Sequence, residues 1–435
     1  MLLIIFFLFY ENNFSYIELT ISGPGTNKIL YENKGENKAC PITTLPDEIV
    51  INNIKQDEIK YEYDFNKEEN IVRLIYNNSL QDMSCLFYSC SKITKIDFYN
   101  FYSLSVELMG SIFNGCTSLK YINFSNFNAS NVSKMQHMFQ NCKSLESINL
   151  SNINASKVIN MTYMFGSCEQ LISIDFNNFL VSELIYMTYM FYNCKKLISL
   201  NLSSFNSPTI QRINHLFENC KSLVFVDLSN FKATNLEYMS YMFYNCISLI
   251  SANLSNFIMT DKLKYIGSIF RNSTSLINVD LSNFYTIKIQ NMDFMFYNCS
   301  SLTYLNLSNF DTSSVTWIES MFDGCVNLQY INLKNAIEIT TKVNYKNIFR
   351  GVPENIVICL NETTAPILTL LIQNKTCYKI NCGDNWGKKQ KKTTKDNEKC
   401  INGCNEIFEY FYEFEDNCVK SNLAKKIFIQ RKMKF

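Results

Sequence analysis

The chain has 435 residues, a formal net charge of +1 and 47% hydrophobic residues. A charge so close to zero provides no global field for nucleic acid or an anionic membrane surface, so we expect no nucleic-acid partner. Only two histidines occur, which argues against histidine-based catalysis and histidine-rich metal sites. We therefore expect neither a metal nor a cofactor, and the apolar content is sufficient for a large core.

The chain begins with an apolar run from Leu2 to Phe9, which polar residues follow. Such a run is typical of the core of a signal peptide, although no basic residues precede it, and it is too short to span a bilayer. The alternative is a buried apolar segment. We expect residues 1–17 to be a signal peptide, the protein to be secreted or at the cell surface, and no membrane span elsewhere.

A repeat of 26 or 27 residues runs through the middle of the chain and is marked by a phenylalanine in a Met-x-x-Met-Phe context. Its copies are Phe87, Phe113, Phe139, Phe165, Phe191, Phe217, Phe243, Phe270, Phe296, Phe322 and Phe349. A period in this range is typical of a solenoid. We expect about eleven repeats within residues 80–352.

One repeat, residues 119–142, reads LKYINFSNFNASNVSKMQHMFQNC. Its first half has the L-x-x-L-x-L spacing of a leucine-rich-repeat strand, in which Ile122 and Phe124 share one face. Its second half places Met135 and Phe139 one helical turn apart, which predicts a short helix or 3₁₀ turn.

A residue that tolerates the left-handed conformation precedes the repeat cysteine, and we expect it to end the helical segment. The members of this column are Gly115, Asn141, Ser167, Asn193, Asn219, Asn245, Asn272, Asn298 and Gly324. Each repeat is therefore expected to be a strand, a turn, a short helix and a second turn.

Stacking such repeats joins their apolar faces into one core. Strands lie about 4.8 Å apart, whereas packed helices need about 8–10 Å, so the helical side would fan out. The expected fold is an α/β repeat solenoid of the leucine-rich-repeat kind, right-handed, with a concave parallel sheet and short convex helices. Residues 18–79 would form an N-terminal cap, with Cys40 and Cys85 as a candidate disulfide pair, and 353–435 a cysteine-rich module with a basic tail.

The segment at residues 301–328, SLTYLNLSNFDTSSVTWIESMFDGCVNL, resembles the BspA-like leucine-rich-repeat surface proteins. Their units read L-x-x-L-x-L-S-x-F-x-T-x-x-V-x-x-M-x-x-M-F-x-x-C, and the resemblance extends over about residues 80–350. It implies display outside the cell or at its surface, and adhesion or binding of partner macromolecules. It brings no catalytic residue that could be transferred to this chain.

Nine cysteines follow the repeat: Cys90, Cys116, Cys142, Cys168, Cys194, Cys220, Cys246, Cys299 and Cys325. An odd number cannot all pair with one another, and a fanned side would separate them beyond the Cα distance of about 7 Å that a disulfide allows. Ser273 replaces the cysteine in one repeat, and metal sites need clustered ligands rather than a line. We interpret these ladder cysteines as buried free thiols.

Six further cysteines lie outside the repeat: Cys359, Cys377, Cys382, Cys400, Cys404 and Cys418. An even set in a secreted chain predicts a small disulfide module, whose connectivity remains open. The alternative is a zinc site formed by four of them, Cys377, Cys382, Cys400 and Cys404.

Alternate strand residues are expected on the concave face, where a column of Asn and Asp either forms hydrogen bonds between repeats or binds a ligand. The candidate binding surface consists of Tyr121, Phe225, Asp227, Asp280, Tyr304, Asn306, Tyr330 and Asn332. Tyr304 and Tyr330 on adjacent repeats could anchor a partner or simply pack across the strands.

Sequons at Asn77, Asn128, Asn154, Asn272 and Asn361 are candidate glycosylation sites if the chain is secreted. His137 and His215 share one repeat position, which we interpret as drift of the repeat.

The sequence contains no Ser–His–Asp set, phosphate-binding glycine loop or H-E-x-x-H motif. We expect a non-enzymatic secreted or cell-surface repeat protein that mediates adhesion, or binds an extracellular protein or glycan, through the concave face. Three alternatives remain open: an enzyme with a cleft where the repeat breaks, an intracellular interaction scaffold, and a self-associating structural coat component.

Overall fold

The computed structural model describes residues 15–35, 40–41, 44–151, 153–231, 233–257, 260–338, 343–354 and 356–373, and five short strands between 379 and 419. The chain divides into two compact units, Met1–Ile247 (unit 1) and Ser248–Phe435 (unit 2). Within the described residues, no helix is both long and apolar enough for a bilayer. The predicted signal peptide falls largely outside the described residues, and its last three residues belong to the first strand.

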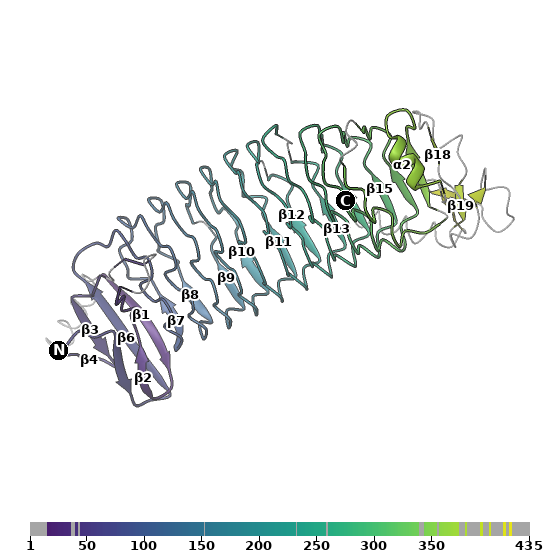
Figure 1. Cartoon of the computed structure of the whole chain (residues 1–435). Coiled ribbons are helices and arrows are strands. Elements are labelled where there is room, and N and C mark those ends of the chain that lie inside the picture. Colours follow the sequence, from purple (N-terminus) through teal and green to yellow (C-terminus); the bar gives the residue numbers. More distant parts are fainter. Residues whose placement is uncertain are drawn as a thin grey trace. The chain divides into compact units, whose positions relative to one another are not determined.

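Unit 1 opens with antiparallel sheets that precede the first repeat (Figure 1). Their strands are β1 (Ser15–Ser22), β2 (Gly25–Lys28), β3 (Glu48–Ile51), β4 (Ile54–Lys55), β5 (Glu62–Phe65) and β6 (Glu69–Tyr76). β1 also pairs antiparallel with β7 (Ile93–Asp97), the strand of the first repeat. The open edge of the repeat sheet is thereby covered, as the end of a solenoid requires.

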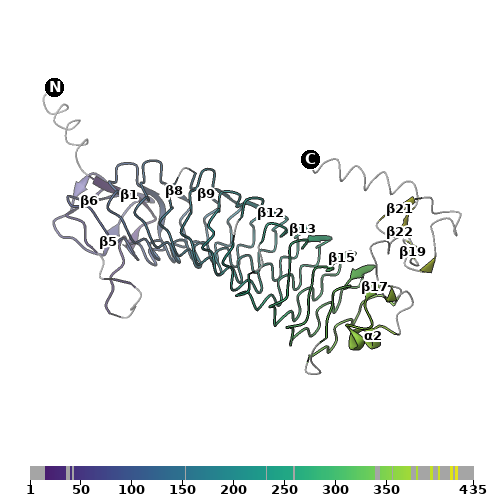
Figure 2. The ribbon, with the colours of Figure 1, turned by 90° about the horizontal axis from the view of Figure 1, so that it is seen from above.

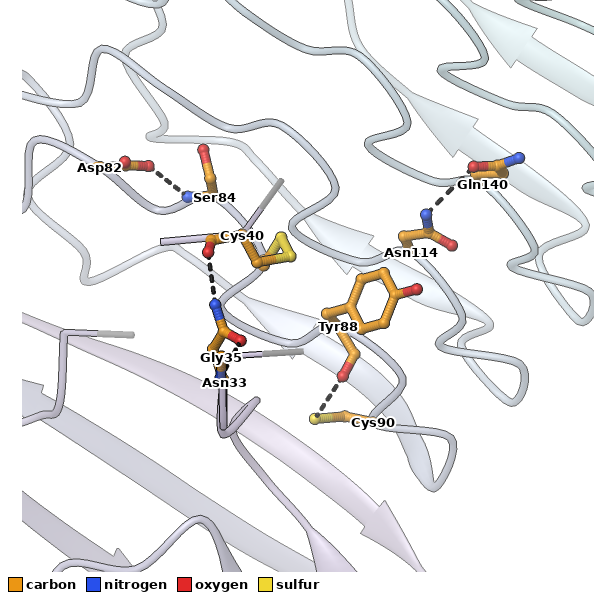
Figure 3. The surroundings of a disulfide bond; sticks show 10 residues. Asn33, Gly35, Cys40, Asp82, Ser84, Tyr88, Cys90, Asn114 and Gln140 are labelled. Carbon is orange, nitrogen blue, oxygen red and sulfur yellow. Dashed lines mark hydrogen bonds between the residues drawn. A yellow bond between two sulfur atoms is a disulfide. The ribbon is translucent and has the colours of Figure 1, made fainter. Parts of the chain in front are cut away.

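A disulfide between Cys40 and Cys85 joins this N-terminal region to the first repeat, with 5.6 Å between the two Cα atoms. Figure 3 shows Asn33 beside it, whose side-chain amide donates to the Cys40 carbonyl oxygen at 2.6 Å and accepts from the Gly35 N–H. The candidate pair is therefore confirmed.

Each following repeat of unit 1, which we call a rung, contributes one three-residue parallel strand. Figure 2 shows these rungs as successive turns of the chain. These strands are β8 (Tyr121–Asn123), β9 (Ser147–Asn149), β10 (Ser173–Asp175), β11 (Ser199–Asn201) and β12 (Phe225–Asp227). Strands pair in register one repeat apart, as Ser173 does with Ser147. The parallel sheet and the period of the solenoid are confirmed.

The second half of each rung is a run of turns where a short helix or 3₁₀ turn was predicted. Alternate N–H groups donate to the next rung: Met135 to the carbonyl of Asn160 and His137 to that of Thr162, at 2.9 and 2.8 Å. The N–H of Met138, which lies between the donors His137 and Phe139, instead donates to the Met135 carbonyl of its own rung at 3.3 Å. Because this side is also bonded from rung to rung, the helix-width argument for a fanned, convex side does not apply.

Two columns of the turn side have positive φ. The first is the predicted Asn, Gly and Ser column, whose left-handed conformation is confirmed, for example at Asn141 with φ 61°. The second was not predicted and contains side chains that rarely adopt this conformation. Its members are Cys85, Ser111, His137, Tyr163, Tyr189, His215 and Tyr241 in unit 1, and Ser268, Phe294, Ser320 and Asn347 in unit 2.

Replacing Ser111 by glycine should therefore stabilise unit 1 by about 1 kcal/mol, because glycine adopts positive φ without the steric cost of Cβ. The control is Ser118→Gly, at a position without positive φ, which should destabilise the unit by about 0.5–1 kcal/mol through backbone entropy. Urea unfolding measures both changes. Equal shifts in the two variants would show that φ at residue 111 carries no strain.

A spine of stacked phenylalanine rings fills the core of unit 1. Adjacent rings of this spine, such as Phe165 with Phe191 and Phe191 with Phe217, have centroids 5.8 and 5.4 Å apart with nearly parallel planes. A second phenylalanine column, which includes Phe179 and Phe205, is also buried.

Unit 2 repeats this construction. Its strands are β13 (Ser251–Asn253), β14 (Asn278–Asp280), β15 (Tyr304–Asn306), β16 (Tyr330–Asn332), β17 (Val357–Leu360) and β18 (Lys379–Ile380), and its described helix is α2 (Pro366–Leu371). β15, β16, β17 and β18 form one parallel sheet. A separate four-stranded sheet contains β19 (Lys392–Thr394), β20 (Cys400–Ile401), β21 (Tyr412–Phe414) and β22 (Asn417–Val419).

Candidate binding surface on the strand face

The first and third residues of each three-residue strand in unit 1 face solvent, because the middle residue points into the core. We call this surface the strand face. Its outward pairs are Tyr121 with Asn123, Ser147 with Asn149, Ser173 with Asp175, Ser199 with Asn201, and Phe225 with Asp227.

The third residue of each strand forms a turn within its own rung. The side-chain oxygen of Asn149 accepts from the Ser151 N–H at 2.8 Å, and that of Asp227 accepts from the Ser229 N–H at 2.9 Å. A hydrogen bond between rungs is recorded at one pair, from the Asn123 amide to Asp97 at 3.0 Å. The column is thus chiefly a set of strand-ending Asx turns rather than the ladder between repeats that the sequence suggested.

The first residue of each strand varies. Tyr121 and Phe225 are each 52% exposed, and the Lys95 ammonium lies 5.6 Å from the Tyr121 ring centroid. The structure does not bring these two rings together, because three rungs with exposed serines separate them.

The equivalent column in unit 2 contains the predicted aromatic pair. Tyr304 and Tyr330 stack with centroids 4.8 Å apart and planes inclined by 8°. Tyr330 is only 5% exposed, so cross-strand packing uses most of its surface. The side-chain oxygens of Asp280, Asn306 and Asn332 accept the N–H groups of Ser282, Ser308 and Lys334, as in unit 1.

A hollow of about 730 Å³ lies on the strand face over β9, β10 and β11. Ser147, Ser173 and the Asn/Asp column line its floor, and the corner loop after β10, with Asn177 and Leu180, lines one side. The predicted residues of unit 1 lie on the same face but outside this lining.

The turn side of unit 1 carries a stacked aromatic column that the sequence did not predict. His137, Tyr163, Tyr189, His215 and Tyr241 follow one another with centroid separations of 5.4, 4.5, 4.2 and 4.7 Å. The imidazole of His215 pairs with the Glu218 carboxylate, and burial raises the pKa of Tyr189 to about 12. The shared repeat position of the two histidines was the available signal. Because each ring stacks on the faces of its neighbours, the ring faces are covered and only the ring edges remain for solvent.

The ladder cysteines are buried and free, which confirms their interpretation as thiols. Each thiol from Cys116 to Cys246 in unit 1 donates to the carbonyl oxygen of the preceding rung's spine phenylalanine, as Cys168 does to Phe139 at 3.0 Å. Burial raises the pKa of Cys90 to about 12 and that of Cys168 well above its ordinary value. The thiols are free as predicted, but fanning is not the reason, because hydrogen bonds join neighbouring rungs on this side.

Among the cysteines outside the repeat, Cys359 is buried and disulfide-bonded. Cys377, Cys382 and Cys404 lie outside the described residues, as do the side chains of Cys400 and Cys418. The disulfide module and its zinc alternative therefore remain predictions. No group of three or more His, Cys, Asp or Glu that could hold a metal occurs among the residues that were placed.

The sequons differ in accessibility. Asn77, Asn128 and Asn154 are exposed, whereas Asn272 is half-buried and its side-chain oxygen accepts from the Asn298 amide at 3.2 Å. Asn361 is also half-buried. Glycosylation remains a prediction, and the exposed sites are the ones that we expect to carry it.

Several solved structures are similar to this chain. A leucine-rich cell surface protein from Faecalibacterium prausnitzii is 16% identical, with a TM-score of 0.31, and the match covers 62% of this chain and 73% of that one. A leucine-rich repeat protein from Eubacterium ventriosum is 13% identical, with a TM-score of 0.23 and coverage of 59% and 90%. The Drosophila Toll–Spatzle complex gives 14% identity, a TM-score of 0.22 and coverage of 71% and 54%.

No curated protein matches the chain. A family model described as "Mycoplasma protein of unknown function, DUF285" matches residues 81–199, 171–262 and 254–355, which together make up more than half of the sequence. The matched region is the repeat region itself, over which the sequence also resembles the BspA-like leucine-rich-repeat surface proteins. The chain therefore belongs to the family described as Mycoplasma protein of unknown function, DUF285.

Proposed function

We propose that this protein is a non-enzymatic repeat protein, secreted or displayed at the cell surface, that binds an extracellular protein or glycan through the strand face of unit 1. The observation that supports this most is that the three residues of each strand have different structural roles. The middle residue packs in the core and the third residue ends the strand, while the first residue faces solvent and varies from rung to rung. A side chain that the fold does not use is available to a ligand.

The turn side of the same rungs is less suited to a ligand. Its aromatic rings stack on one another, so their faces are already occupied. The histidines belong to this stack, and the thiols are buried with raised pKa. Neither group is therefore in the exposed, activated state that a nucleophile or a general base requires.

A binding experiment with the full chain tests the proposal. Wild-type protein should bind at least one member of an array of extracellular proteins and glycans. The double variant Ser173→Arg, Ser199→Arg should weaken that binding about tenfold or more, because two long charged side chains would cover the centre of the strand face.

The matched control is Ser182→Arg, an exposed serine in the corner loop after β10 rather than on a strand. It should bind as the wild type does, and all three proteins should give the same far-UV circular dichroism. A wild type that binds nothing on the array, or a double variant that binds normally, would overturn the proposal.

A further inference from the structure

We infer that the ligand of the strand face is a neutral glycan, held in the hollow over β9, β10 and β11. This inference rests on the proposed function and narrows its ligand class. It depends on three properties of the hollow: its unused hydrogen-bonding groups, its charge, and the rings that lie beyond its two ends.

The hydrogen-bonding groups of the Asn/Asp column are only partly used by the fold. Asn149, Asp175 and Asn201 each engage one side-chain oxygen in their own turn, at 2.8–2.9 Å. No hydrogen bond of the described residues uses the amide donors of Asn149 and Asn201 or the second oxygen of Asp175. The hydroxyl groups of Ser147 and Ser173 likewise have no recorded hydrogen-bond partner in this part of the chain.

These groups differ in whether they donate or accept hydrogen bonds, and that mixture favours a polyhydroxyl ligand. Each side-chain amide offers two donors, the carboxylate only accepts, and each serine hydroxyl does both. A sugar hydroxyl also donates and accepts, so a glycan can match any order of these groups along the floor. An apolar surface placed against them would instead desolvate them without compensation, at a cost for every unpaired group.

The apolar anchors of the strand face lie outside its centre, which argues against a protein ligand at the hollow. Protein partners are usually held by aromatic or aliphatic side chains in well-packed central pockets. Here Ile148 and Ile174 also line the hollow, but Ile148 is buried and Ile174 is half-buried, and the exposed large apolar side chain in the lining is Leu180, in the corner loop.

The charge of the lining selects among glycans. Asp175 is the only charged residue in it, so the hollow has a negative charge with no positive group to offset it. A glycan with sulfate or carboxylate groups would be repelled at this short range. A neutral glycan carries no charge and would not be repelled.

Exposed rings lie beyond both ends of the hollow. Tyr121 and Phe225 are each two rungs from Ser173, which is about 10 Å at the strand spacing. A linear glycan that follows the column of first residues would therefore leave the polar floor and meet an exposed aromatic ring in either direction.

The test measures binding of the full-length chain to neutral oligosaccharides and to sulfated or uronic-acid oligosaccharides of equal length. Wild type should bind neutral members and reject the anionic ones. Ser173→Tyr should weaken binding about tenfold or more by filling the hollow. It should still fold, because Tyr121 and Phe225 occupy the same strand position in this chain. Asp175→Asn should bind anionic members more tightly than the wild type does.

Ser251→Tyr is the matched control, because it makes the same change at the same strand position in β13, outside the hollow. It should bind as the wild type does. Protein-only binding that the Ser173→Arg, Ser199→Arg variant abolishes would overturn the glycan inference and leave the proposed function standing. Binding to nothing would overturn both, and unchanged glycan binding by Ser173→Tyr would overturn the location.

Discussion

Raising the pH above about 9 is expected to unfold unit 1 over a narrow range, because seven free thiols are buried in its core. Burial raises the pKa of Cys90 to about 12 and places those of Cys116, Cys142 and Cys168 well above the ordinary thiol value. The cause is desolvation, since the thiolate would lie among apolar side chains, and at Cys90 this outweighs the opposing positive charge of Lys28.

The direction of the effect follows from proton linkage. Between pH 8.5, roughly the pKa of an unfolded thiol, and the raised pKa of the folded one, the unfolded chain loses a proton that the folded chain keeps. The free energy of unfolding then falls by about 1.4 kcal/mol per pH unit for each thiol. If the seven rungs unfold together, this is about 10 kcal/mol per pH unit, which is comparable to the whole stability of an ordinary domain.

Urea unfolding between pH 8 and pH 11, followed by far-UV circular dichroism, measures this slope. The matched variant is Cys168→Ser, Cys194→Ser, because Ser273 occupies the same buried position in another rung. Its slope should be smaller by about 2.7 kcal/mol per pH unit, since two titrating groups are gone while tyrosines and lysines are unchanged.

A thiol count in denaturant without reductant is the companion measurement. All of the ladder cysteines should react once the chain is unfolded, and none in the native protein at pH 8, where the buried groups are protonated and inaccessible. Equal alkaline slopes in the wild type and the double serine variant would show that the thiols do not control this stability.

The sequence predicted those parts of the fold that depend on the properties of residues within a single repeat. The period follows from the recurring phenylalanine, and the strand from the alternation of Ile122 and Phe124 around Asn123. The left-handed column followed from Asn and Gly, whose conformational preference is intrinsic. The N-terminal disulfide was open to prediction because Cys40 and Cys85 stand apart from the ladder.

The turn side was misjudged because its hydrogen bonds are not local. Met135 and Phe139 have a spacing that a helix and a chain of turns share, and only the bonds from one rung to the next distinguish the two. Those bonds also impose positive φ on tyrosine and histidine, against their own preference. Stacking between neighbouring rings offsets part of that strain, which no single repeat could reveal.

The predicted residues of unit 1, Tyr121, Phe225 and Asp227, share the strand face with the hollow but lie on β8 and β12, outside its lining. The Asn/Asp column was considered either a ladder or a binding row, and its actual role is to end each strand. The hollow depends on the corner loop with Leu180 lying beside β9, β10 and β11. Residues of different rungs come together there only through the stacking of the solenoid.

Replacing Phe191 by alanine should cost about 4 kcal/mol of unfolding free energy, within the range for deletion of a fully buried aromatic ring. Phe191 is 0% exposed and stacks between Phe165 and Phe217, so its loss leaves a cavity and removes two ring contacts at once. The neighbouring rings cannot close over the cavity, because backbone hydrogen bonds fix the separation of the rungs on both sides.

The same substitution at Phe225 provides the control. That ring is 52% exposed on the strand face, so Phe225→Ala should change the free energy of unfolding by less than about 1 kcal/mol. Urea unfolding of the two variants compares a core ring with a surface ring in the same unit. Equal losses would mean that the strand-face ring is itself part of the packing that holds the rungs together, and the proposal that this column is free for a ligand would then fail.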